Sequence, residues 1–106
     1  MSDIRKARKA LTRRILEGEG KASPSDRRAA FNNSGLAEPT GTLVDKVARN
    51  VYKISDEDIA AARAADLSED EVFEIVVCAA VGQATRQYDS ALAALDAATG
   101  IATGKD

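Results

Sequence analysis

The sequence has no histidine and only one cysteine, Cys78, among its 106 residues. A single cysteine cannot close a disulfide within the chain, so the sequence excludes a small secreted scaffold held together by disulfides. Protein zinc sites are built mainly from cysteine and histidine, and no such cluster exists here. The sequence therefore predicts no metal site and no cofactor.

Long apolar runs and alternating strand patterns are also missing. No apolar run is long enough to cross a membrane, and residues 1–6 lack the apolar stretch of a signal peptide, so we expect a cytoplasmic protein. Alanine and other helix formers dominate, and the two prolines, Pro24 and Pro39, fall between candidate helices. These features predict a single all-α domain over residues 1–106.

Charge is divided unevenly along the chain. Residues 1–30 hold nine basic and four acidic side chains, net +5, and residues 31–106 hold six basic and thirteen acidic ones, net −7, which gives −2 overall. Residues 1–22 read as a basic N-terminal helix or arm. Such an arm can bind nucleic acid, or it can lie on the acidic remainder of its own chain or of a neighbour. Nothing else in the sequence supports a nucleic-acid partner.

The strongest helix signal begins at Ser68. Ser68 is a good N-cap, and Glu71 three residues later completes a capping box. From Val72 to Val81 the only charge is Glu74. A helix that is apolar around most of its circumference must be wrapped by other helices, so this segment predicts a long buried C-terminal helix running to about Ala98.

Four further helices are predicted ahead of this one. Ser23 with Pro24, and Ser55, are N-terminal caps, and Gly18 ends the first helix. Residues 99–106 are predicted to form a flexible tail. The predicted helices cover residues 3–17, 24–35, 42–52 and 56–65.

Residues 42–98 resemble the alkylhydroperoxidase AhpD-like and carboxymuconolactone decarboxylase family. The resemblance is carried by the segment Ile59–Ser68, by Glu71–Glu74, and by the apolar helix that runs on to Val81. It implies a five-helix AhpD-like domain with a core at residues 42–98. It also implies a homo-oligomer, a dimer, trimer or hexamer, formed through helix faces.

The resemblance stops at the family's reactive centre. Peroxidases of the family carry a Cys-x-x-Cys motif and a nearby histidine, and these positions fall near Val51, Ile54 and Asp58 here. A thiol peroxidase needs a second thiol to resolve the oxidised one, and the decarboxylase branch uses histidine as well. The family's glycine in the turn is Asp66, which can still adopt a left-handed conformation. The chain therefore resembles a divergent member without the thiol peroxidase centre.

Two residues of the last helix are candidates for catalysis, Glu74 and Cys78. Glu74 lies among apolar residues, so it is expected to pair with a cation or to act as a general base. Cys78 is either a nucleophile or a small buried side chain, and burial beside a carboxylate should raise its pKa. The cations considered as partners of Glu74 are Lys46, Arg49, Arg63 and Arg86.

A second polar patch predicts a possible ligand site. Arg86 and Asp89 are one turn apart and can form an ion pair. Alternatively, Arg86 lines a cavity with Gln83 and Tyr88 and holds a small anionic ligand. Tyr52 is counted as a further ligand candidate because it ends the third predicted helix. Gly82 is expected to allow close helix packing, and the pairs Arg13–Arg14 and Arg27–Arg28 are expected on a solvated or interfacial face.

Three hypotheses for function follow. The sequence favours a non-catalytic structural, binding or accessory subunit, because the family's cysteines and histidine are absent. The first alternative is an enzyme of altered chemistry that acts on a small anionic or lactone-like substrate in an enclosed pocket, with Glu74 as base and Arg86 as anchor. The second is an adaptor whose basic arm binds an acidic protein partner.

Overall fold

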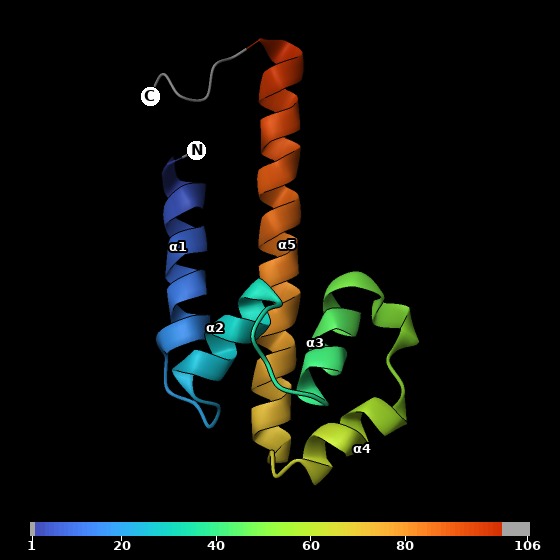
Figure 1. Cartoon of the computed structure of the whole chain (residues 1–106). Coiled ribbons are helices and arrows are strands. Elements are labelled where there is room, and N and C mark those ends of the chain that lie inside the picture. Colours follow the sequence, from blue (N-terminus) through green and yellow to red (C-terminus); the bar gives the residue numbers. More distant parts are fainter. Residues whose placement is uncertain (1, 101–106) are drawn as a thin grey trace.

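The computed structural model describes residues 2–100 and contains only helices within them. The predicted all-α fold is confirmed (Figure 1). Five α-helices and one short 3-10 turn, η1, follow one another along the chain. Their bounds are α1 Ser2–Glu17, α2 Pro24–Asn32, α3 Thr40–Arg49, η1 Val51–Lys53, α4 Asp56–Ala64 and α5 Glu69–Thr99.

Serine side chains cap the starts of α2, α4 and α5, as the sequence predicts. The Ser23 hydroxyl accepts the Asp26 backbone N–H at 3.0 Å, and Pro24 opens α2. At α5 the Ser68 hydroxyl accepts the Glu71 N–H, and the Glu71 carboxylate accepts the Ser68 N–H at 2.9 Å. This reciprocal capping box fixes the first turn of the longest helix.

Left-handed residues shape both ends of α5. Asp66, in the turn before the helix, has φ 70°, so it adopts the left-handed conformation that was considered possible there. The helix ends at Thr99, and Gly100 follows it with φ 75°. The tail predicted at residues 99–106 lies outside the described residues from residue 101 onward.

The third helix differs from its prediction at both ends. It was expected at residues 42–52 and is found at Thr40–Arg49. Asn50 leaves the helical region, with φ −145° and ψ 60°, although its N–H still donates to the Lys46 carbonyl. The chain then turns through η1, so Val51 leaves the apolar stripe of the helix and is exposed. The rest of the predicted stripe is buried, namely Leu43, Val44, Val47 and Ala48.

The core lies where α2, α3 and α4 pack against the first half of α5. Ile75 and Ala79 of α5 are fully buried there with Leu43 and Val44 of α3. Helix α2 crosses α5 at Gly82, where an added methyl group would lie 2.0 Å from the Phe31 carbonyl oxygen. Gly82 therefore serves close helix packing, as the sequence predicts.

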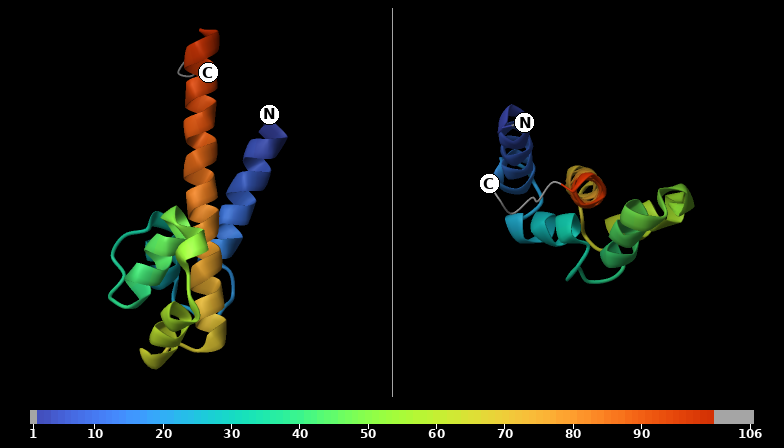
Figure 2. Two further views of the ribbon diagram at one scale, coloured as in Figure 1. Left: turned by 90° about the vertical axis from the view of Figure 1, so that its right-hand side faces the viewer. Right: turned by 90° about the horizontal axis from the view of Figure 1, so that it is seen from above.

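Neighbouring helices cover only one side of α5. Seen from above, α1, α2, α3 and α4 form an arc around it (Figure 2). Phe73, within the apolar stretch, is 68% exposed, and Leu95 near the far end is 57% exposed. The prediction of a helix wrapped on most sides is therefore wrong for this outward face, because the chain has too few helices to close around a 31-residue rod. Within residues 2–100, no helix is long and apolar enough to cross a membrane.

Candidate functional site

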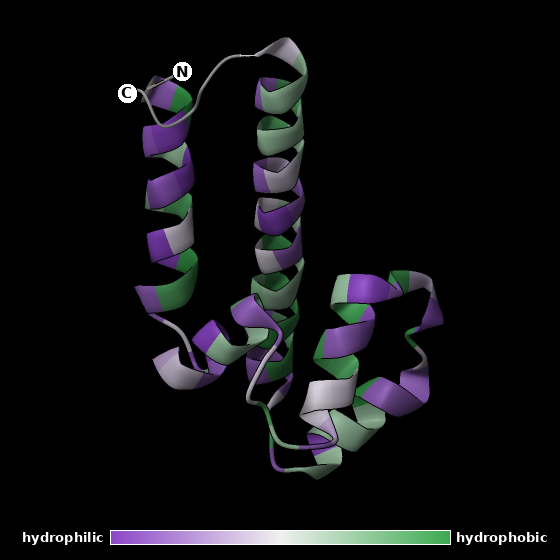
Figure 3. Ribbon diagram, turned by 45° about the horizontal axis from the view of Figure 1, so that its top comes forward, coloured by the Kyte–Doolittle hydropathy of each residue, from purple (hydrophilic) through white to green (hydrophobic). Residues whose placement is uncertain are grey.

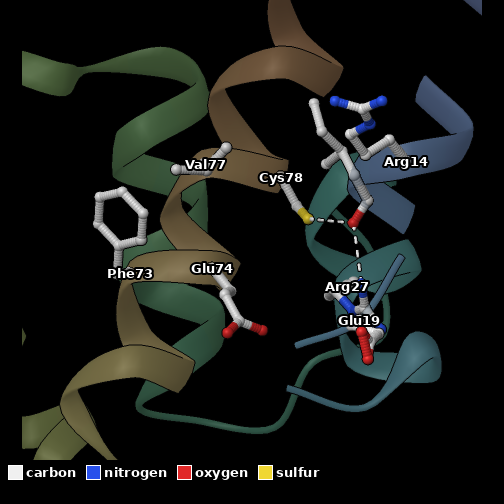
Figure 4. Close-up of a pocket in the computed structure, with 8 residues that line it drawn as sticks. Arg14, Glu19, Arg27, Phe73, Glu74, Val77 and Cys78 are labelled. Atoms are coloured by element: carbon white, nitrogen blue, oxygen red, sulfur yellow. Dashed lines mark hydrogen bonds between the residues drawn. The ribbon is translucent and has the colours of Figure 1, made fainter. Parts of the chain in front are cut away.

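Both catalytic candidates line one hollow of about 190 Å³ where the α1–α2 loop meets α5 (Figure 4). The Glu74 carboxylate points into this hollow, and the Cys78 sulfur points toward the end of α1. The hollow is open to solvent on one side. Its lining residues are Arg14, Ile15, Glu19, Arg27, Phe73, Glu74, Val77 and Cys78.

Glu74 is bound by two backbone amides of the α1–α2 loop. Its Oε2 accepts the Lys21 N–H at 2.9 Å, and its Oε1 accepts the Ala22 N–H at 2.8 Å. A methyl group at Gly20 would lie 2.6 Å from Oε1, so the glycine lets the loop approach. The Lys21 hydrogen bond, then the Ala22 hydrogen bond and the charge of Arg27, lower the pKa of Glu74 against an opposing effect of burial. An ionised carboxylate with a lowered pKa is a weak general base.

The expectation that Glu74 forms an ion pair with Lys46, Arg49, Arg63 or Arg86 is wrong, because its carboxylate accepts from backbone amides instead. Lys46 forms an ion pair with Asp58 at 3.0 Å, and Arg49 pairs with Asp45 at 3.1 Å, both on the far side of α5. Glu74 is bound by backbone amides of the α1–α2 loop, which make no backbone hydrogen bond within a helix. Charge patterns in a sequence do not show such backbone donors.

Arg27 is the residue of this site that the sequence prediction missed. It was expected on a solvated or interfacial face but is only 5% exposed. Its Nη1 donates to the carbonyls of Ile15 at 3.2 Å and Gly18 at 2.7 Å, and its Nε donates to the Ala22 carbonyl at 3.1 Å. The guanidinium thus caps the carbonyl end of α1, where acceptors lack helical partners and the helix dipole favours a cation.

One signal could have revealed this role. Arg27 lies one turn before Ala30, which is fully buried on the inner face of α2. A single arginine on the buried face of a helix, close to a preceding helix that ends at glycines, indicates that its guanidinium binds the last carbonyl groups of that preceding helix.

Cys78 is buried, as predicted, with 1% of its surface exposed. Its Sγ lies 3.7 Å from the Ile15 carbonyl oxygen and donates to it. Burial raises the pKa of the Cys78 thiol and Glu74 raises it further, while Arg27 partly opposes both. The side chain is thus a neutral thiol, which is a poor nucleophile.

The second polar patch divides into two parts. Arg86 donates through Nη1 to the Phe31 carbonyl and through Nη2 to the Gln83 Oε1 at 3.1 Å. It therefore caps the carbonyl end of α2. The predicted pairing of Arg86 with Asp89 is wrong, because the exposed α2 carbonyl competes successfully for the guanidinium.

Asp89 and Tyr88 contact α1 instead. The Asp89 carboxylate accepts from Arg8 Nη2 at 2.8 Å. The Arg8 guanidinium also lies 4.5 Å from the centre of the Tyr88 ring, a cation–π contact. These residues join the outer half of α5 to α1, and Tyr88 does not share a cavity with Arg86.

Tyr52 lies beside a different hollow, of about 370 Å³, between α3, η1 and α5. It is 79% exposed, and its hydroxyl donates to the Asn50 side-chain oxygen at 3.3 Å. Gln83 lines the same hollow, so these two predicted ligand candidates do come together. The hollow is open, and neither Glu74 nor Arg86 lines it.

A third hollow, of about 570 Å³, lies along α1 and α2 and is strongly basic. Figure 3 shows that hydrophilic residues dominate the outer side of α1. In the part of the chain that is described, no group of three histidine, cysteine or acidic residues could hold a metal ion. The cations that line the basic hollow are Arg5, Arg8, Lys9, Arg13 and Arg28.

The family assignment has no external support from known proteins. Comparisons with protein-family models, with curated proteins and with solved structures found no match for this chain.

Proposed function

We propose that this chain is a divergent AhpD-like protein without the thiol peroxidase centre. It acts as a non-catalytic structural, binding or accessory subunit of a homo-oligomer. The observation that carries the proposal is the engagement of Glu74 by the Lys21 and Ala22 backbone amides. The residue best placed to act as a base instead fixes the loop between α1 and α2.

The neighbouring groups support the same proposal. Arg27 is occupied by three carbonyl oxygens of the loop and of α1. Cys78 is a buried thiol with a raised pKa, and the chain has no second cysteine to resolve an oxidised one. The positions of the family's reactive motif are taken by Val51, Ile54 and Asp58, which offer no thiol or imidazole.

The geometry does not favour the alternative enzyme with Glu74 as base and Arg86 as anchor. The two residues are twelve positions apart on α5, about 18 Å along the axis at the usual rise of a helix. Glu74 faces the α1–α2 loop, whereas Arg86 is bound to the end of α2. A small substrate cannot contact both.

A peroxidase assay with a recycling thiol reductant tests the proposal. We expect no turnover above the reductant blank, and the same result for Cys78→Ser. Turnover that Cys78→Ser abolishes would overturn the proposal. Thermal melting of both proteins serves as the control, because Cys78→Ser changes the side chain little in volume.

The basic hollow favours one binding role within this proposal, the capture of an acidic protein segment. Arg5, Lys9 and Arg13 lie along α1 at the four-residue spacing of one helix face. Replacing all three with glutamate should abolish binding of a poly-glutamate peptide and leave the helical content unchanged. A triple glutamate variant at Lys53, Arg63 and Arg49 is the matched control, and equal loss in both variants would rule out a specific site.

A further inference from the structure

The outward face of α5 carries an unbroken line of uncharged residues from its first turns to its last. Steps of three and four residues place them all on one side of the helix. All are exposed or partly exposed. We call this line the α5 seam, and its members are Phe73, Val77, Ala80, Ala84, Tyr88, Ala91, Leu95 and Ala98.

Charge is excluded from the α5 seam although 30% of the chain is charged. The charged residues of α5 that have partners on other elements all turn away from the seam. Glu74 binds the α1–α2 loop, Arg86 binds α2, and Asp89 binds α1. A long uncharged face on a helix whose paired charges all bind other elements marks a contact surface.

The shape of the molecule also indicates a missing partner. The radius of gyration is 15.9 Å, whereas a compact domain of this length has about 13 Å. In the view from above, the arc of α1 to α4 leaves the seam side of α5 without a neighbouring helix (Figure 2). Among the described residues, Arg8 of α1 contacts the seam at Tyr88, and no helix lies over the rest of it.

The α5 seam is complementary to itself when two copies run antiparallel. A two-fold axis near residue 86 then sets Phe73 of one copy against Ala98 of the other. The same axis pairs the small Ala84 with the large Tyr88, and it pairs two small residues, Ala80 and Ala91. The remaining pair is Val77 with Leu95.

Parallel pairing lacks this complementarity. It sets Phe73 against Phe73 and Tyr88 against Tyr88, while Ala80 and Ala84 meet their own copies and leave gaps. Because interaxial distance follows side-chain size, a parallel pair cannot keep one distance along the seam. The antiparallel order allows an even, close approach.

The available area approaches what such a pair needs. The seam is about 38 Å long at the helical rise, and a helix face about 10 Å wide then offers roughly 380 Å² per copy. Two seams bury roughly 760 Å², and the exposed Val51 and Tyr52 beside them bring the total toward the roughly 1,000 Å² that a specific interface needs.

We propose that a second copy of this chain docks antiparallel on the α5 seam and closes the Tyr52 hollow. This inference rests on the proposed function, whose partner and contact face it names. Ala80 and Ala84 belong both to the seam and to the lining of that hollow. The α5 of the second copy therefore lies over its open side and turns it into a pocket shared by two chains.

Multi-angle light scattering on the full chain tests the proposal with two matched variants. Ala91→Glu places a charge in the seam, and Ala93→Glu places the same charge on another exposed face of the same turn. We expect a dimer that Ala91→Glu weakens at least about 100-fold, because a carboxylate would be buried unpaired. Ala93→Glu should leave it intact, and Leu95→Glu should repeat the loss in the seam.

Cysteine cross-linking tests the register. Ala80→Cys with Ala91→Cys should give a covalent dimer under mild oxidation, while Ala91→Cys alone should not. A monomer, a dimer indifferent to both seam variants, or efficient cross-linking by Ala91→Cys alone would overturn the proposal. An oligomer that is unaffected by the seam variants and lacks peroxidase turnover refutes this inference alone. A monomer also refutes the homo-oligomer of the proposed function, and turnover that depends on Cys78 refutes the absence of a thiol peroxidase centre.

Discussion

The two halves of α5 are held in different ways. The first half is fixed by hydrogen bonds from the α1–α2 loop to Glu74 and by the close crossing of α2 at Gly82. The second half is joined to α1 through the exposed contacts of Arg8 with Asp89 and Tyr88. Toward its N-terminus α1 diverges from α5 (Figure 2). The contrast teaches that backbone donors and close packing hold the first half, while exposed side-chain contacts alone join the second half to α1.

The largest effect is expected at the crossing of α2 and α5. Gly82→Ala should lower the free energy of unfolding by about 3 kcal/mol, because the new methyl meets the Phe31 carbonyl. Helix propensity alone predicts the opposite sign, a gain of about 1 kcal/mol. Urea unfolding followed by circular dichroism decides between the two, and a stabilised variant would contradict the close crossing.

Loss of the buried guanidinium should follow in size. Arg27→Met leaves the carbonyls of Ile15, Gly18 and Ala22 without their donor, at an expected cost of about 2 kcal/mol. Arg28→Met is the control, since Arg28 is exposed and its ion pair with Glu17 is worth at most about 0.5 kcal/mol. The free energy of unfolding of both variants is measured with urea. An equal loss in Arg27→Met and Arg28→Met would contradict the structural role assigned to Arg27.

Glu74→Gln should cost about 1–2 kcal/mol at neutral pH, because a charged acceptor of two amides is lost. The pKa of Glu74 is lowered from 4.5 in the folded state, so its contribution is complete above pH 4.5 and disappears as pH falls through the folded pKa. The Ser55 backbone hydrogen bond and Lys46 also lower the pKa of Asp58. The resulting pH dependence of the unfolding free energy is the same in the wild-type protein and in Glu74→Gln. The difference in unfolding free energy between the wild-type protein and Glu74→Gln, measured against pH, therefore reports the contribution of Glu74. A difference that grows toward acid pH would refute the assignment of Glu74 as an ionised acceptor.

The smallest effect is expected in the outer half. Arg8→Ala removes an exposed ion pair and a cation–π contact, together worth about 0.5–1 kcal/mol. Amide hydrogen exchange should speed up in α1 and leave the first half of α5 unchanged. A cost as large as that of Arg27→Met would erase the difference between the two halves.

The helices were predictable because their signals are local. Ser23, Ser55 and Ser68 each cap a helix in the structure, and the capping boxes lie where the sequence places them. The end of α3 was not predictable, because the break at Asn50 follows no proline or glycine. Cys78 was predicted to be buried because it sits within the apolar stretch of α5.

Of the candidate site, Glu74 and Cys78 were predicted, but Arg27 and the hydrogen-bond partners of these residues were not. Glu74 and Arg86 both bind backbone groups of distant loops and helix ends, which side-chain patterns do not encode. The α5 seam was hidden for another reason. Sequence periodicity shows that a helix is apolar on most sides, but only the number and course of the other helices decides which side they cover.

The most direct test of the central claim is the pKa of the Glu74 side chain, followed by ¹³C NMR of the carboxyl group across a pH titration. If Glu74 holds the α1–α2 loop as an ionised acceptor of two amides, its midpoint lies below 4.5. A midpoint shifted upward toward neutrality would contradict the account, because it would describe a carboxyl group poised to take a proton.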